Sequence, residues 1–237
     1  VYSSGPFSLL GRQHELVFGI NASDSEYNAP ENELWYITGY DPSVPNFINW
    51  DGNSPAAPYL PATGRYKFRE RQFGAYATAK FKPTDKLAIL AGARVSHWHQ
   101  ATEHEPGDRE SKSETGEVTP YIAVTYDITD IASVYASYTT IFSPQSYRDI
   151  NGTFLPPLEG NSLEAGVKHA FYGGRLNTSL AVFHVEQDNT PVELVGVPSP
   201  AGGAAYRAEK GTTSKGFEAE LAGELQPGWQ VSGGYTY

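Results

Sequence analysis

The residues of this 237-residue chain best suited to chemistry are three histidines, His97, His99 and His104, which stand close to Glu103 and Glu105. Imidazole and carboxylate groups can bind metals and can transfer protons. These five residues lie where a strand pattern runs into an acidic polar stretch, so we interpret them as a solvated rim and expect no metal centre. The chain has no cysteine, and its Ser, His and Asp residues show no catalytic spacing. The sequence therefore indicates a protein that is not an enzyme.

The net charge of −10 sets a second limit on function. An acidic protein repels the phosphate backbone, so this charge argues against nucleic acid as a partner. Acidic residues are in clear excess at 25–65, 101–115, 142–161 and 188–212, while the rest of the chain is nearly balanced. The negative charge therefore belongs to one set of connecting segments.

The elements that position these residues are segments in which apolar and polar residues alternate, a pattern that predicts β-strands. We expect strands at about 1–10, 14–24, 66–82, 86–100, 116–128, 131–141, 162–171, 175–187, 213–226 and 229–237. The four acidic connections alternate with short turns at 11–13, 83–85, 129–130, 172–174 and 227–228. Short turns on one side and long loops on the other are typical of an all-β, antiparallel, up-and-down transmembrane β-barrel. No apolar run reaches the roughly 18 residues of a transmembrane helix.

Each predicted strand has one apolar face and one polar face. Phe217, Ala219 and Leu221 share one face of such a strand, and Glu218 and Glu220 share the other. In a barrel the first face meets lipid and the second a wet lumen. The alternative is a soluble β-sandwich or propeller with the apolar face in its core. The expected strands exceed the roughly five or six residues usual in soluble sheets, and aromatic residues gather at their ends, which favours the barrel.

The stretch at 138–168 reads YTTIFSPQSYRDINGTFLPPLEGNSLEAGVK and resembles the barrel signature of TonB-dependent siderophore receptors. The matching pattern is aromatic-x-Pro-Gln, Asp-x-x-Gly, Leu-x-Pro and Glu-x-Gly-x-Lys. The stretches at 5–23, 71–94, 173–189 and 214–237 are similar to the same family. The resemblance fades at 25–65 and 101–115, where the choice of ligand should reside. Haem receptors usually carry Arg-Ala-Pro and Asn-Pro-x-Leu boxes near 142–161, and this chain has Phe-Ser-Pro-Gln and Leu-Pro-Pro-Leu instead.

The resemblance implies a bacterial outer-membrane barrel of roughly 22 strands, preceded by a plug domain. Residues 1–237 would then be a partial barrel with the plug absent; the alternative is an independent ten-stranded barrel. The implied function is energy-coupled uptake of a ferric siderophore, with the TonB energy-coupling protein acting through the missing plug. The siderophore carries the iron, so the receptor needs no cofactor. A TonB-dependent receptor for another cargo (haem, cobalamin or a glycan) and a passive porin-like barrel remain alternatives.

Facing strands at 66–82 and 86–100 predict a cargo-binding wall. By the alternation of their strands, three aromatic residues face the lumen: Tyr66, Phe68 and Trp98. Trp50 and Tyr59 lie in the adjoining loop. Aromatic surface with a few polar anchors suits recognition of the organic shell of a siderophore. The alternative is ordinary strand and loop packing. The acidic loops disfavour strongly anionic cargo and favour a neutral or cationic ferric hydroxamate or mixed-ligand siderophore.

The opposite face of the strand at 66–82 has a row of cations. This row shares its face with Phe73, Ala75 and Phe81, so it falls at the outer edge of the lipid-facing band. We predict an outward patch that binds the phosphates of lipopolysaccharide through charge-assisted hydrogen bonds. A solvated strand end is the alternative, and a β-bulge would turn the cations inward. The predicted patch consists of Arg65, Lys67, Arg69 and Arg71, with His97 and His99 beside them.

Overall fold

The computed structural model describes residues 1–32, 43, 46–53 and 61–237. These residues form two compact units. The first unit contains 1–22, 72–98 and 114–237, and the second contains 23–71 and 99–113. The predicted all-β antiparallel fold is confirmed, since strands make up nearly all of the regular structure. No helix in the described ranges is long and apolar enough to cross a membrane.

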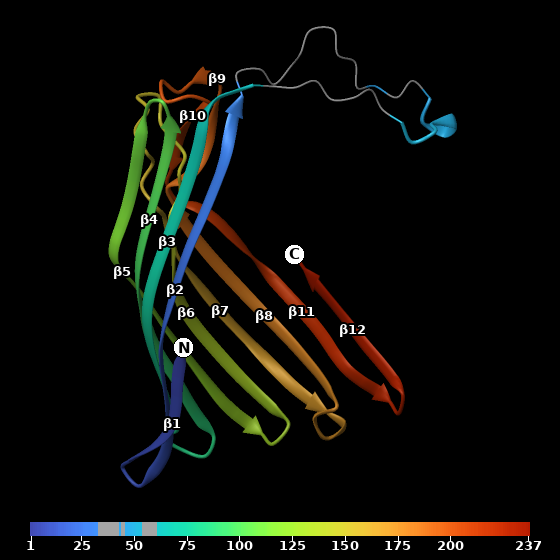
Figure 1. Cartoon of the computed structure of the whole chain (residues 1–237). Helices are drawn as coiled ribbons and strands as arrows, with labels where there is room; N and C mark the ends of the chain where they lie inside the picture. Colours follow the sequence, from blue (N-terminus) through green and yellow to red (C-terminus); the bar gives the residue numbers. More distant parts are fainter. Residues whose placement is uncertain (33–42, 44–45, 54–60) are drawn as a thin grey trace. The chain divides into compact units, whose positions relative to one another are not determined.

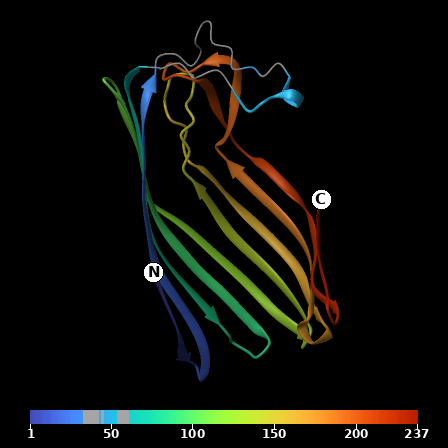
Figure 2. The ribbon, with the colours of Figure 1, turned by 45° about the vertical axis from the view of Figure 1, so that its right-hand side comes forward.

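Ten strands form one sheet in the order β1-β2-β3-β4-β5-β6-β7-β8-β11-β12 (Figure 1). Every ladder given for this sheet is antiparallel. Strands β6, β7, β8, β11 and β12 run side by side (Figure 2). Their bounds are β1 (Tyr2–Leu9), β2 (Arg12–Asn32), β3 (Ala62–Phe81), β4 (Leu87–Glu105), β5 (Arg109–Thr129), β6 (Ala132–Ser143), β7 (Leu158–Phe171), β8 (Leu176–Asp188), β11 (Thr212–Gln226) and β12 (Trp229–Thr236).

The sheet is open in this chain. β1 and β12 are its two edge strands, and among the described residues no ladder joins them. The alternative of a closed ten-stranded barrel is therefore wrong for this chain. Each edge strand leaves a row of backbone N–H and C=O groups without a partner strand on its outer side.

Short turns join the strands where the sequence predicts them. β1 and β2 meet at Leu10 and Gly11, whose φ angles are 51° and 74°. Two successive residues of positive φ are the geometry of a tight hairpin whose twist matches that of its strands, and glycine adopts it without strain. The two-residue turn fixes the register, which runs from Leu9 opposite Arg12 to Tyr2 opposite Gly19.

The apolar face of the first unit is continuous from strand to strand. One row crosses five strands in register, from β5 through β6, β7 and β8 to β11. Its members stay largely exposed to solvent, as Val182 is 60% and Phe217 44% exposed. Exposed apolar surface of this extent suits contact with lipid. The row consists of Val124, Ala136, Ala165, Val182 and Phe217.

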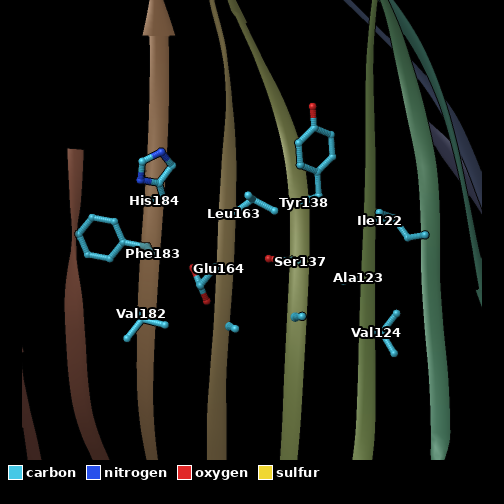
Figure 3. A pocket seen from close by; sticks show the side chains of 12 residues that line it. Ile122, Ala123, Val124, Ser137, Tyr138, Leu163, Glu164, Val182, Phe183 and His184 are labelled. Atoms are coloured by element: carbon cyan, nitrogen blue, oxygen red, sulfur yellow. The ribbon is translucent and has the colours of Figure 1, made fainter. Parts of the chain in front are cut away.

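A shallow apolar groove of about 450 Å³ lies on this face (Figure 3). Ala136 and Ala165 are small, and they lie between the larger side chains of neighbouring rows. The row of Ile122, Tyr138 and Leu163 borders the groove on one side. We assign the groove to the lipid-facing surface, because its lining is nearly all carbon.

The opposite face of the same strands is polar. The Tyr135 hydroxyl donates a hydrogen bond of 2.5 Å to Glu164, and the Lys168 ammonium lies 4.6 Å from the Tyr135 ring centroid. Ser179 donates to Glu220 across β8 and β11. These charged groups are solvated or paired, as the predicted lumen face requires.

Three connections predicted as long loops contain strands. The segment at 101–115 is mostly β4 and β5, and only 106–108 connects them; β2 and β3 likewise extend into 25–65. The prediction was wrong because both faces of these strand ends are polar, so the sequence shows no alternation. The segment at 188–212 holds a separate two-stranded sheet of β9 (Thr190–Pro198) and β10 (Ala204–Glu209). The remaining elements are the short helices η1 (Phe47–Asn49) and η2 (Tyr172–Gly174).

A charge placed on the apolar row should be far more damaging than one on the neighbouring residue. We predict that Val124→Arg lowers the free energy of unfolding by about 2–4 kcal/mol in lipid vesicles, because the guanidinium would face hydrocarbon. Thr125→Arg, on the polar face of the same strand, is the matched control and should have a much smaller effect. Denaturant titration of the full-length protein measures both. Equal losses for the two variants would contradict the assignment of the faces.

Candidate functional site

Four side chains from three strands of the second unit form a cluster that contains one residue of the predicted wall. The Tyr66 ring of β3 lies 6.1 Å from the Tyr27 ring of β2 and 5.2 Å from the His104 ring of β4, measured between centroids. His104 Nδ1 lies 3.1 Å from Glu31 Oε1 and 3.3 Å from Glu31 Oε2. We call Tyr27, Glu31, Tyr66 and His104 the tyrosine–histidine cluster. It is about half exposed and therefore accessible to a ligand.

The other predicted wall residues have varied surroundings. Phe68 is half-buried and shares the face of Tyr66, because alternate residues of a strand point the same way. Trp98 belongs to the first unit and is buried, with 7% of its surface exposed. Trp50 is exposed, and its indole N–H donates to the backbone oxygen of Asn53. Tyr59 lies outside the described residues.

Sequence reasoning missed Tyr27 and His104 as members of this cluster. Tyr27 falls within the predicted loop at 25–65, and His104 within the acidic rim. The available signal was the alternation of side chains along the strands. If the predicted strands had been continued through residues 27 and 104, both residues would have fallen on the same face as Tyr66. In the part of the chain that the structure describes, no group of three or more His, Asp or Glu residues could hold a metal ion.

The predicted row of cations is tied to two carboxylates of β2. Arg69 Nε and Nη2 donate to the two oxygens of Asp24 at 2.9 Å and 2.5 Å. Arg71 Nε lies 3.4 Å from the same carboxylate, and Lys67 Nζ lies 3.5 Å from Glu26. These cations alternate with Tyr66 and Phe68 along β3, so they occupy the opposite face from the cluster.

The remaining patch residues have their own contacts. His99 Nδ1 lies 2.8 Å from the Ser113 hydroxyl, and the His97 ring packs 6.1 Å from that of Phe73. Arg65 borders a cavity of about 540 Å³ at the loop ends of β2 and β3.

In the first unit, the loop at 144–157 and the hairpin at 189–211 are interlocked, and we call them the paired loops. The Tyr147 and Tyr206 rings lie 4.5 Å apart, and the Tyr206 amide donates to the Arg148 carbonyl at 2.7 Å. The Ser199 hydroxyl donates to the Asp149 carbonyl at 3.1 Å. Ala205 is fully buried, so these contacts enclose a small core.

The motif residues Asp149 and Gly152 build the turn at the tip of the 144–157 loop. The Asp149 carboxylate accepts from the Thr153 amide at 2.8 Å and from the Asn151 amide at 2.9 Å. These bonds, with Thr153 the larger cause, hold the pKa of Asp149 below its usual value. Their contribution to the turn is therefore present above that usual value, and it is lost as pH falls through the lower folded value. Gly152 has a φ of 81° and lets the chain reverse.

Comparison with known proteins places this chain in a family. The family model described as "TonB dependent receptor-like, beta-barrel" matches residues 2–237. The chain belongs to the TonB-dependent receptor family. It is therefore an outer-membrane β-barrel chain of a family of transport receptors, and the predicted localisation and fold class are confirmed.

Relatives of this receptor chain bind iron carriers. It is 42% identical over 243 residues to the ferripyoverdine receptor of Pseudomonas aeruginosa. The aligned region covers 100% of this chain and 29% of that protein. It is 28% identical to the ferrioxamine B receptor of Salmonella typhimurium, covering 94% of this chain and 30% of that protein. The chain thus spans less than a third of the length of these relatives.

Solved receptor structures share its fold. The P. aeruginosa ferripyoverdine receptor bound to ferripyoverdine matches with a TM-score of 0.84 and 40% identity, covering 100% of this chain and 31% of that one. The alcaligin outer-membrane receptor of Bordetella pertussis matches with a TM-score of 0.74 and 31% identity, covering 100% and 37% of the two chains.

Loosening one of the paired loops of this receptor should loosen the other. We predict that Tyr206→Ala accelerates amide hydrogen exchange in both 145–157 and 190–209, because the ring contact with Tyr147 is lost. Exchange measured by mass spectrometry on the full-length receptor reports both segments. Tyr172→Ala, in the short η2 turn, is the control and should leave both unchanged. Faster exchange in 190–209 alone would show that the loops open independently.

Proposed function

We propose that this chain is part of the barrel of a receptor that takes up a ferric siderophore across the outer membrane. The observation that carries the proposal is the 42% identity to a ferripyoverdine receptor over the whole chain. The family and the named relatives favour siderophore cargo over haem, cobalamin or a glycan, and energy-coupled uptake over a passive porin.

The sheet of this chain is open, and the chain covers only part of the length of its relatives. Both observations support a larger barrel of which this sheet is one part. We infer that the rest of the protein supplies the remaining strands, up to about 22 in all, together with a plug through which TonB acts. The receptor would perform no chemistry on its cargo. Iron would remain bound by the siderophore, and the protein would need no cofactor or iron ligand of its own.

Recognition would fall to aromatic surface on the face of Tyr66 and Phe68. Flat aromatic rings bury large apolar area and orient organic ligands, and a few polar groups fix the position. In the second unit, Tyr27 and His104 extend the surface that Tyr66 offers. Trp98, Trp50 and Tyr59 remain predicted wall residues, with Trp98 acting from its buried position on β4.

Uptake in cells tests the proposed function. The full-length gene should restore import of radioactive iron as ferripyoverdine or ferrioxamine B in a strain that lacks its own siderophore receptors, and import should stop when TonB is deleted. Import that continues without TonB would indicate a passive pore and contradict the proposal. Failure to import either compound would contradict the assigned cargo class.

Variants of the wall test recognition in the same assay. Tyr66→Ala should weaken cargo binding by about fivefold, since one aromatic contact contributes on the order of 1 kcal/mol. Trp98→Ala should weaken it as well, and Trp98→Phe should retain much of the affinity. Unchanged affinity in Trp98→Ala would remove this residue from the site.

Lipopolysaccharide is the second partner that we propose, on the opposite face of β3. Lys67, Arg69 and Arg71 pair with two carboxylates, Asp24 and Glu26, and Arg65 continues the same row of cations. The excess positive charge, with His97 and His99 on the neighbouring strand β4, suits phosphate groups. The ion pairs hold the Arg69 and Arg71 guanidinium groups against β2, which lowers the entropy lost on binding.

Binding to lipopolysaccharide should depend on this row. We predict that Arg69→Gln/Arg71→Gln lowers the lipopolysaccharide that co-purifies with the receptor several-fold, because both residues lose their charge. Arg207→Gln, on the exposed β10 strand, is the matched control. Phosphate assay of the purified detergent complex gives the amount. Equal amounts in all three proteins would remove the patch.

A further inference from the structure

The tyrosine–histidine cluster combines aromatic rings and a carboxylate on a partly exposed surface. The Tyr27 and Tyr66 rings lie 6.1 Å apart, with Tyr27 59% exposed and Tyr66 partly exposed. The His104 ring, 5.2 Å from that of Tyr66, holds the Glu31 carboxylate through both oxygens, yet the Glu31 side chain remains 42% exposed. A carboxylate fixed next to aromatic rings can bind a further group without reorganising.

The backbone of β3 passes close to this carboxylate at Gly64. Gly64 of β3 has no side chain, and a Cβ there would lie 3.6 Å from Glu31 Oε2. The same atom would lie only 2.2 Å from the backbone oxygen of Glu105, so the position excludes any larger residue. Gly64 also lines the cavity of about 540 Å³ at this end of β2 and β3, together with Pro30, the residue before Glu31. The Gly64 side of Glu31 is therefore filled by backbone, and a ligand group can approach the carboxylate from its exposed side.

The chemistry of the cluster selects for positive charge. Aromatic ring faces attract cations, and a carboxylate binds ammonium or guanidinium groups through charge-assisted hydrogen bonds. An anionic group would be repelled by Glu31 and by the neighbouring Glu103 and Glu105. The imidazole of His104 already supplies one N–H to Glu31, and a second donor can use the lone pairs that remain.

We propose that Tyr27, Tyr66 and Glu31 form a subsite for a cationic group, a primary ammonium or a guanidinium, on the organic shell of the siderophore. His104 is a positioning residue that orients Glu31. This inference rests on the proposed function, since it names the part of the cargo that the cluster binds. The subsite selects among siderophores by charge and leaves iron itself to the siderophore.

Two probes that differ in one charge test the subsite on the full-length receptor in detergent. Ferrioxamine B ends in a primary ammonium, and its N-acetyl derivative is neutral at that end. Wild type should bind ferrioxamine B about tenfold more tightly than the derivative. Glu31→Gln should abolish this preference and leave the affinity for the derivative unchanged. Glu26→Gln, on the opposite face of the same strand, is the matched control and should keep the preference.

Further variants separate the parts of the subsite. Tyr66→Phe keeps an aromatic face and should keep the preference, whereas Tyr66→Leu should reduce it. His104→Gln keeps a donor to Glu31 and should retain the preference, whereas His104→Leu should lose it. A structural role alone would not produce this rescue by the conservative variant.

The outcomes distinguish this inference from the proposed function. Equal affinity of wild type for both probes, or a preference that survives Glu31→Gln, would overturn the subsite. Binding of ferripyoverdine without binding of either ferrioxamine probe would also overturn it, while the uptake proposal would stand. If none of the three compounds binds to wild type, the proposed function itself fails.

Discussion

The constraint on which the rest of the structure depends is that hydrocarbon offers no hydrogen-bond partner to the backbone. Every N–H and C=O group inside the membrane must therefore be paired within the protein, and antiparallel ladders achieve this between neighbouring strands. The ladders from β5 to β12 follow from that requirement. They also fix the register, and the register decides which residues share a face. The apolar row through Val124 and Val182 and the polar face at Tyr135 and Glu164 are two results of one pairing.

The same ladder geometry persists where both faces of the sheet are polar. In the second unit, alternate residues of β3 still point to opposite sides. One side holds Arg69 and its ion pair with Asp24, and the other holds Tyr66 with Tyr27 and His104. A single strand thus presents charge for one kind of partner and aromatic surface for another. The two proposed binding surfaces are separated because successive side chains of the strand point to opposite faces.

The predictable part of the fold is the part where one face meets lipid. There, residues such as Phe217 and Glu218 alternate, and the strands, turns and faces follow from the sequence. The acidic ends of β4 and β5 could not be predicted in this way, because water on both sides removes the selection for apolar residues. The β9–β10 hairpin had a weak signal in Gly202 and Gly203, which mark its turn, but neighbouring prolines obscured it. Of the candidate site, Tyr66 followed from parity, whereas its partners Tyr27 and His104 depended on strand ends that the sequence did not reveal.

In the proposed receptor, one face of β3 meets cargo and the other does not. This chain has no cysteine, so single cysteines can be introduced along β3 and labelled with a membrane-impermeant thiol reagent on the full-length receptor. Ferripyoverdine should slow labelling at 66, 68 and 70 and leave labelling at 67, 69 and 71 unchanged. Protection that ignores this period of two, or that falls on 67, 69 and 71, would contradict the assignment of the cargo-binding face.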